Sequence, residues 1–402
     1  MLEILERLDT FRKKLIDLTS RNSLLSSNLT STSLLRFVDE LPDQVFNYII
    51  EEGNSMYLQA VPLPTEEDFW LLKGFDEETL AEMDPEDRKI LEEALDEYLS
   101  RTAIEHAKSL DINTSYEAPT VDPADELVEK HQDNQLQTLH FYEDLDAYAA
   151  KIRRFANESL HEKGMNTLYL TFGYLEWKDV KHENRTHLAP LISVPVSISR
   201  ETKKEVTSRK RSSEGELKTL SRKLYKIEYN GSDISTNEAL KLKLESHGLV
   251  LPEFESDNDP EDYFSVITEE IITHNSTWKI HRYINLSKLD FSGSILYQDL
   301  DIKNWLDESL GNHPLIGQIL GERLPNQPGD VDYELDANPE LDVEAPIVMD
   351  ADSSQHSAMI DALRGKNMVI LGPPGTGKSQ TITNLIAGFL HQKKKVLFVA
   401  QK

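Results

Sequence analysis

The chain has 402 residues, of which 39% are hydrophobic, and it carries a formal net charge of −28 at pH 7. This length suggests two or three domains with folded cores. The absence of cysteine excludes disulfides and thiolate metal sites, and no apolar stretch reaches the length of a membrane span. Because the first twenty residues also lack the pattern of a signal peptide, we expect a cytoplasmic protein without membrane contact.

The acidic balance also bears on the partners of the chain. Proteins that bind nucleic acid use Lys and Arg to neutralise phosphates, so a chain with this net charge should repel DNA and RNA unless a local patch overrides the repulsion. An acidic surface is instead suited to the basic surface of a protein partner.

The first part of the chain, residues 1–162, is predicted to be mainly helical. Apolar residues from Ile4 to Leu18 recur every three or four positions and indicate an amphipathic opening helix that packs on a core. Asp84 and Pro85 have the residue types of a helix start, with proline in the first turn. A longer helix is expected over about 143–162.

Residues 163–300 are predicted to be rich in strands. Apolar and β-branched residues fill 166–199, and further strands are expected at 225–229 and 277–284. Together with the helices before them, these strands predict an α+β accessory region that spans residues 1–324.

Residues 200–223 hold a basic stretch within the acidic chain. A solvated hairpin loop between two strands is the simpler interpretation. The functional alternative is contact with nucleic acid through Arg209, Lys210 and Arg211, because this is a locally positive patch in an acidic context.

Residues 325–348 combine prolines with many acidic residues and few apolar ones, so we expect an acidic linker there. A second domain should then begin at residue 349 and continue to residue 402.

Residues 372–379 read Gly-Pro-Pro-Gly-Thr-Gly-Lys-Ser, which is a complete phosphate-binding P-loop. The apolar run 367–371 before the loop predicts a buried strand. The spacing of apolar residues in 379–391 predicts a helix, and 396–400 predicts a second strand. This order is a βαβ unit with the loop at the junction of strand and helix.

The residue types of the loop suit a nucleoside triphosphate with Mg²⁺. Gly372, Gly375 and Gly377 allow a close approach that a Cβ would block. Backbone N–H donors are expected from Gly375, Thr376, Gly377, Lys378 and Ser379, since the two prolines have none. The Lys378 ammonium should contact the β- and γ-phosphates, and the Ser379 hydroxyl should bind Mg²⁺.

Gln355 lies seventeen residues before the loop, in the first turn of a helix that Asp352 or Ser353 should cap. Its amide offers a donor and an acceptor on neighbouring atoms, which suits the edge of adenine. A solvated position on the helix surface is the alternative interpretation.

Residues 350–355, 371–387 and 396–400 closely resemble the start of superfamily 1 DNA/RNA helicases. The resemblance implies a RecA-like α/β domain that uses ATP and Mg²⁺, with adenine contacted by Gln355. It also places Gln380 at the nucleotide, and it implies DNA or RNA as a partner.

Segments nearer the N-terminus resemble an uncharacterised domain that precedes such helicases in bacteria. The similar segments are 15–25, 166–177, 189–196 and the residues around Asn237. Relatives of this kind are often encoded with nucleases or in defence loci, so the resemblance also suggests an antiviral role.

The sequence departs from the helicase pattern after Lys402, where no acidic Walker B strand, second RecA-like domain or arginine finger follows. These parts supply metal anchoring, water activation and charge stabilisation. We therefore expect only the first βαβ unit of an incomplete domain, which holds a nucleotide weakly and does not hydrolyse it. The main track for DNA or RNA should belong to the absent part.

The favoured interpretation is thus the N-terminal portion of an ATP-dependent helicase or translocase. The alternative is a module that senses or docks a protein partner, with the P-loop as a nucleotide-dependent switch. Glu176-Trp177-Lys178 is half of a nuclease signature, but no acidic residue precedes it in 163–175. A strand end with Trp177 packed on the core is the better interpretation.

Overall fold

The computed structural model describes residues 2–75, 84–120, 133–179, 185–206, 219–255, 257–272, 277–304, 315, 319, 333–334 and 340–400. The chain divides into two compact units, 1–312 and 313–402, which we call unit 1 and unit 2. Arg209, Lys210 and Arg211 lie outside the described residues. No helix in the described ranges combines the length and apolarity needed to cross a membrane.

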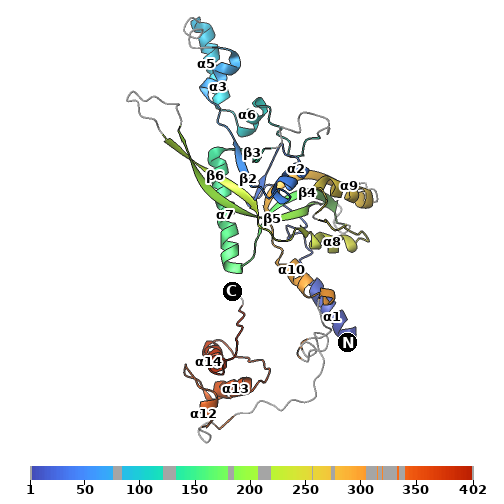
Figure 1. Cartoon of the computed structure of the whole chain (residues 1–402), viewed down its shortest axis with the longest axis vertical. Coiled ribbons are helices and arrows are strands. Elements are labelled where there is room, and N and C mark those ends of the chain that lie inside the picture. The colour runs from blue at the N-terminus through green and yellow to red at the C-terminus, as the bar shows by residue number, and fades with distance from the viewer. Residues whose placement is uncertain are drawn as a thin grey trace. The chain divides into compact units, whose positions relative to one another are not determined.

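Unit 1 is built around one mixed sheet (Figure 1). Its strands are β1 (Leu34–Arg36), β2 (Met56–Val61), β3 (Gln135–Phe141), β4 (Leu168–Lys178), β5 (Thr186–Val206), β6 (Thr219–Tyr229), β7 (Ser235–Thr236) and β8 (Lys279–Lys288). The strand order is β1-β8-β4-β5-β6-β2-β3, and β7 pairs with β5 beside this path. The β2–β3 pair is parallel, whereas β4, β5, β6 and β8 pair antiparallel.

Several helices of unit 1 begin at a residue whose side chain caps the first turn. The described helices of this unit are α1 (Leu2–Lys13), α2 (Pro42–Ile50), α3 (Glu66–Lys73), α5 (Pro85–Leu99), α6 (Ala103–Ser109), α7 (Tyr142–Lys163), α8 (Glu238–Glu245), α9 (Pro260–Ile267) and α10 (Ser292–Asp299), with the short turns η2 (Thr268–Ile272) and η3 (Ile302–Asn304). The Asp84 side chain accepts the backbone N–H of Glu86 at the start of α5, as the sequence predicts. Helix α7 covers the long helix expected near 143–162.

The core of unit 1 is centred on β4, which is buried at nearly every position. Both faces of this strand are therefore covered. The ladder with β8 shifts register between Phe172 and Tyr174, where Gly173 has a positive φ of 71°. A Cβ at Gly173 would lie 2.2 Å from Cε1 of Phe264 in α9, so the missing side chain lets the helix approach the strand.

The segment 15–25 forms a compact turn that is tied to the sheet. Asn22 Nδ2 donates to the carbonyl of Asp17, and Asn22 Oδ1 accepts the N–H of Leu24. The carbonyls of Leu24 and Leu25 accept hydrogen bonds from buried Asn237 and Trp177, at 2.6 and 3.0 Å. Trp177 is thus packed on the core, as expected from the sequence.

The basic stretch differs from the expected loop over much of its length. Strand β5 continues to Val206, and β6 already begins at Thr219. Lys203 pairs with Arg222 within this two-stranded ribbon. Aromatic and β-branched residues alternate with charged ones in β6 only from Tyr225 to Tyr229, a pattern that suits a ribbon with one solvated face.

Unit 2 contains α12 (Glu340–Glu344), α13 (Ser353–Leu363) and α14 (Lys378–His391). The expected linker differs from the structure in its last part, because Leu341 and Ala345 are buried against Ile360 and Leu363. These two apolar residues are one helical turn apart and so face α13 together. Residues 340–348 consequently belong to the folded unit.

The two buried strands expected around the P-loop are not formed. Residues 366–373 and 394–400 have no strand assignment, and Leu371 and Leu397 are 90% and 89% exposed. Apolar runs become buried strands only when neighbouring strands pair with their backbone and helices cover both faces. No described residue pairs with these runs in that way, so the expected βαβ unit is present as loop and helix only.

Candidate nucleotide site

The P-loop wraps around the start of α14. Gly377 is the residue before the helix, with φ of 71°, and Gly375 has φ of 88°. Glycine is the residue that takes this left-handed conformation at little cost. No side-chain hydrogen bond caps α14 at Gly377, so the first N–H groups of the helix face the loop as donors for an anion.

The loop is held by its own side chains. The Thr376 hydroxyl donates to the carbonyl of Pro373 at 2.9 Å. Lys378 Nζ donates to the carbonyls of Gly372 and Pro373, at 2.6 and 2.7 Å. A phosphate bound here would replace these contacts of the ammonium, which already points at the loop.

Gln355 lies at the same loop although it comes from another helix. Its Nε2 donates to the carbonyl of Thr376 at 2.9 Å, and its Oε1 accepts the backbone N–H of Asp352 at 3.2 Å. The Asp352 side chain in turn accepts the N–H of Gln355, which completes a capping box at the start of α13. Of the two expected caps, Asp352 is the one used.

The remaining predicted residues gather at the helix start. Ser379 is exposed in the first turn, and Gln380 is half-buried. A Cβ built on Gly377 would lie 2.5 Å from Gln355 Nε2 and 2.7 Å from Gln380 Oε1. The structure therefore brings Gln355, Gln380 and the loop together around Gly377. In the described part of the chain no group of His, Asp and Glu side chains is arranged to hold a metal ion.

One residue that supports this site was not singled out from the sequence. Asn384 is fully buried in α14, where its Oδ1 accepts the N–H groups of Val348 and Met349, both at 2.9 Å. Its Nδ2 donates to the carbonyl of Met349 at 2.9 Å. These bonds fix the segment before α13 against the P-loop helix. An asparagine within an otherwise apolar helical pattern was the available signal.

Comparison with known proteins places most of unit 1 in one family. The sequence profile described as "Protein of unknown function (DUF4011)" matches residues 14–244, which is more than half of the chain. The chain belongs to the DUF4011 family. The match includes the segment 15–25 and Asn237, so the contacts between them lie within the family domain.

The DUF4011 chain is also similar to two proteins named as uncharacterized ATP-dependent helicases. It is 25% identical over 264 residues to one from Mycoplasma genitalium, which covers 63% of this chain and 22% of that protein. It is 49% identical over 51 residues to the homologue from Mycoplasma pneumoniae, which covers 13% of this chain and 4% of that protein. The chain thus spans about a fifth or less of these relatives. No solved structure matches it.

Proposed function

We propose that this chain is the N-terminal portion of an ATP-dependent DNA/RNA helicase or translocase of superfamily 1, in which the P-loop of unit 2 holds ATP. The observation that carries the proposal is the meeting of Gln355 with the loop at Thr376, next to an uncapped helix start. The names of the two Mycoplasma relatives agree with it. A role in antiviral defence belongs to the same proposal.

The residues have distinct parts in this proposal. The loop and the first turn of α14 offer N–H groups to the phosphates, and Lys378 adds its positive charge. The Ser379 hydroxyl is exposed and supplies one oxygen ligand for Mg²⁺. Gln355 exchanges its bond to Thr376 for the edge of adenine, which releases the loop carbonyl when the nucleotide enters.

Titration of a fluorescent ATP analogue against the 402-residue chain tests the site. Lys378→Ala should weaken binding at least about tenfold, since it removes a charge-assisted contact to phosphate. Lys395→Ala is the matched control, because Lys395 is an exposed lysine outside the loop. Equal affinities of the two variants would contradict the site.

Gln355→Ala tests the choice of nucleotide. The variant should lose about tenfold in affinity for ATP and little for GTP, because the amide reads only the base. An equal loss for both nucleotides would assign Gln355 to holding the loop rather than to adenine.

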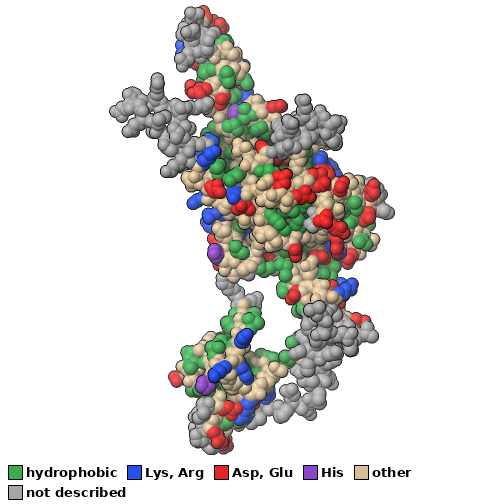
Figure 2. Space-filling model, in the orientation of Figure 1, with side chains coloured by type: hydrophobic (Ala, Val, Ile, Leu, Met, Phe, Trp, Pro, Cys, Tyr) green, Lys and Arg blue, Asp and Glu red, His purple; other side chains and the backbone are tan. Residues whose placement is uncertain are grey.

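A partner-docking module with a nucleotide-dependent switch is the second candidate. The acidic side chains over α9 and its surroundings favour it, since they form a surface suited to a basic protein (Figure 2). Stimulation of ATP turnover by DNA or RNA in the full-length protein separates the two candidates. A motor requires this stimulation. A docking module does not, and it retains partner binding in Lys378→Ala.

A further inference from the structure

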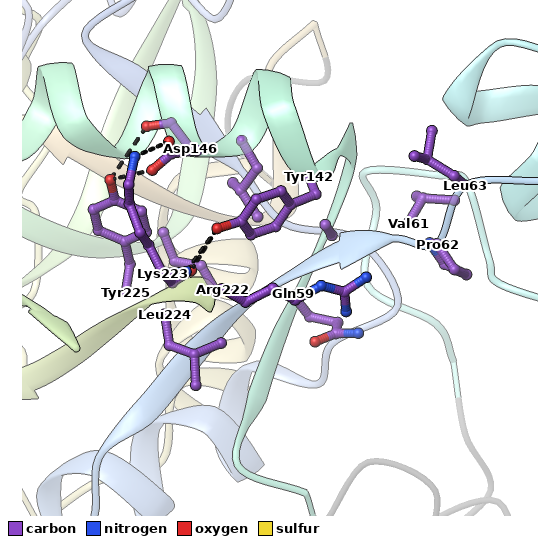
Figure 3. A pocket seen from close by; sticks show the side chains of 13 residues that line it. Gln59, Val61, Pro62, Leu63, Tyr142, Asp146, Arg222, Lys223, Leu224 and Tyr225 are labelled. Carbon is purple, nitrogen blue, oxygen red and sulfur yellow. Dashed lines mark hydrogen bonds and ion pairs between the residues drawn. The ribbon is translucent and has the colours of Figure 1, made fainter. Parts of the chain in front are cut away.

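Unit 1 contains a pocket at the point where two strands of the sheet separate. Strand β2 pairs with β6 only at Met56 and Tyr57, whereas its pairing with β3 on the other edge runs from Tyr57 to Val61. The first turns of α7 cover the gap between β2 and β6, and the pocket that lies there has a volume of about 150 Å³ (Figure 3). A cavity of this size takes a ligand of one ring.

One end of the pocket is polar and ordered by hydrogen bonds. Asp146 of α7 accepts hydrogen bonds from Lys223 Nζ at 2.5 Å and from the Tyr225 hydroxyl at 2.6 Å. Burial opposes ionisation of Asp146, but the bonds from Lys223 and Tyr225 outweigh it and hold the pKa of this carboxyl below its ordinary value. The pocket therefore presents a carboxylate acceptor beside an ammonium donor.

The mouth of the pocket carries flat groups. The Tyr142 hydroxyl accepts the backbone N–H of Lys223 at 2.7 Å, which fixes the ring over the gap. The guanidinium of Arg222 lies 5.6 Å from the centre of this ring. Leu58, Ala60 and Val61 of β2 form an apolar wall. A planar ligand can thus lie against the tyrosine ring, the guanidinium and the apolar side chains.

The ribbon of β5 and β6 continues from this mouth and is locally basic. Its described residues 196–203 and 222–229 contain five basic and two acidic side chains, in a chain with a net charge of −28. Lys203 stands directly opposite Arg222 in the ladder, so two positive side chains lie together on the ribbon. Figure 2 shows Lys and Arg side chains gathered along this side of unit 1, whereas acidic side chains gather over α9.

We propose that the pocket between β2, β6 and α7 receives one unstacked base of a single-stranded nucleic acid, whose phosphates run along the β5–β6 ribbon. Base edges carry both donors and acceptors, which match Asp146 and Lys223. Cytosine suits the pocket best, because it has one ring, an amino donor for Asp146 and a carbonyl acceptor for Lys223. The site is distinct from the nucleotide site of unit 2 and goes beyond the function proposed for it.

Fluorescence anisotropy of a labelled single strand of deoxycytidine nucleotides tests this site with the 402-residue chain at about 0.1 M salt. The wild type should bind the strand, and Arg222→Ala should weaken binding about tenfold, because stacking and phosphate contacts are lost together. Arg88→Ala is the matched control, since Arg88 is an exposed arginine on α5. It should bind like the wild type.

A second pair of variants tests the pocket without touching its hydrogen bonds. Leu63 at the mouth is 56% exposed, so Leu63→Glu adds a repelling charge there without disturbing the core, and it should also weaken binding about tenfold. Leu72→Glu makes the same change at an exposed leucine of α3, outside the pocket, and should have no effect. Binding equal to wild type in both Arg222→Ala and Leu63→Glu would overturn the proposal, as would an equal loss in the two controls.

Three further comparisons identify the occupant. A duplex of the same length should bind more weakly than the single strand, because its bases are stacked; equal binding would contradict the base pocket. Deoxycytidine monophosphate alone should bind more weakly than the strand, and equal affinity would show that a free nucleotide is the ligand instead. Lys378→Ala should bind the strand like the wild type, whatever becomes of ATP binding. Loss of the strand in that variant would place the site in unit 2 and overturn the proposal.

Discussion

The two units place similar apolar sequences in opposite surroundings. In unit 1, residues 168–175 of β4 are all buried, and neighbouring strands pair with both edges of the strand. In unit 2, Val369, Leu371, Leu397 and Val399 are each more than 80% exposed. The residue types are alike, so strand propensity alone does not explain the difference.

The two units differ in whether neighbouring strands pair with their apolar runs and other elements cover them. A strand with two apolar faces is stable when neighbouring strands satisfy its backbone and other elements cover it. Unit 1 has these neighbouring elements, and its stability should therefore depend on the buried side chains of its sheet. The P-loop unit is held by helices α12, α13 and α14 and by single polar side chains such as Asn384. Four predictions probe this contrast.

Gly173→Ala should have the largest effect. The new Cβ would lie 2.2 Å from the ring of Phe264 at a φ of 71°, so we expect the free energy of unfolding to fall by about 4 kcal/mol. Urea denaturation followed by tryptophan fluorescence measures it, because all four tryptophans lie in unit 1.

Gly53→Ala is the control for Gly173→Ala. Gly53 has φ of 65° but no atom within 4 Å of a built Cβ, so it should lose only about 1 kcal/mol for the backbone. In the background of Phe264→Ala, the cost of Gly173→Ala should drop to a similar value. If the cost stays near its full size there, the clash is not its cause.

Substitution of matched leucines tests the contrast between the units directly. Leu170→Ala removes a fully buried side chain of β4 and should destabilise unit 1 by about 3 kcal/mol. Leu397→Ala, at a residue that is 89% exposed, should change the stability of unit 2 by less than about 0.5 kcal/mol. Amide hydrogen exchange resolves the two units in one experiment. A large effect of Leu397→Ala would mean that its apolar run is covered in solution.

Asn384→Ala tests whether one amide holds unit 2 together. The variant removes three hydrogen bonds to residues 348 and 349, and we expect a loss of about 2 kcal/mol because water can reach these partly exposed residues. Exchange of the α14 amides should accelerate roughly thirtyfold. Asn367→Ala, at an exposed asparagine of the same unit, should leave exchange unchanged.

Features that depend on residues close together in the sequence could be predicted from the sequence. The left-handed backbone at Gly375 and Gly377 follows from the residue type, and the start of α5 follows from Asp84 and Pro85. The helix of Gln355 and its cap by Asp352 have the same local origin. The helicase resemblance implied that Gln355 contacts adenine, whereas its hydrogen bond to Thr376 was found only in the structure.

Features that depend on distant partners could not be predicted. Asn237 binds carbonyls 213 and 47 residues away, and no local pattern reveals such a connection. The pocket at Asp146 exists because β2 leaves β6, which is a property of strand pairing. Leu371 and Leu397 show the opposite error. Their apolar runs predict buried strands, but the sequence does not specify which strands would pair with them, and both residues are exposed.

Asp43→Asn should have the smallest effect on stability, and this effect should depend on pH. Asp43 in α2 accepts a hydrogen bond from the N–H of Glu261 in α9, so the variant tests the contact between these two helices of unit 1. Burial raises the pKa of Asp43 to about 6, and the nearby carboxylates of Glu261, Asp259 and Asp262 add to the rise, against the N–H of Glu261 that Asp43 accepts. The folded state therefore binds the proton more tightly than the unfolded state. The stability that this provides is complete below about pH 4, where both states are protonated, and it is lost as the pH rises through about 6.

An asparagine keeps the acceptor for Glu261 and carries no charge. Asp43→Asn should therefore raise the free energy of unfolding by about 1 kcal/mol at pH 8, a value reduced for the partial exposure of the site, and by nothing near pH 4. Urea denaturation at the two pH values measures the difference, with the exposed Asp233→Asn as a control that should show no gain. A gain of equal size at both pH values would show that charge burial at Asp43 is not what limits this part of unit 1.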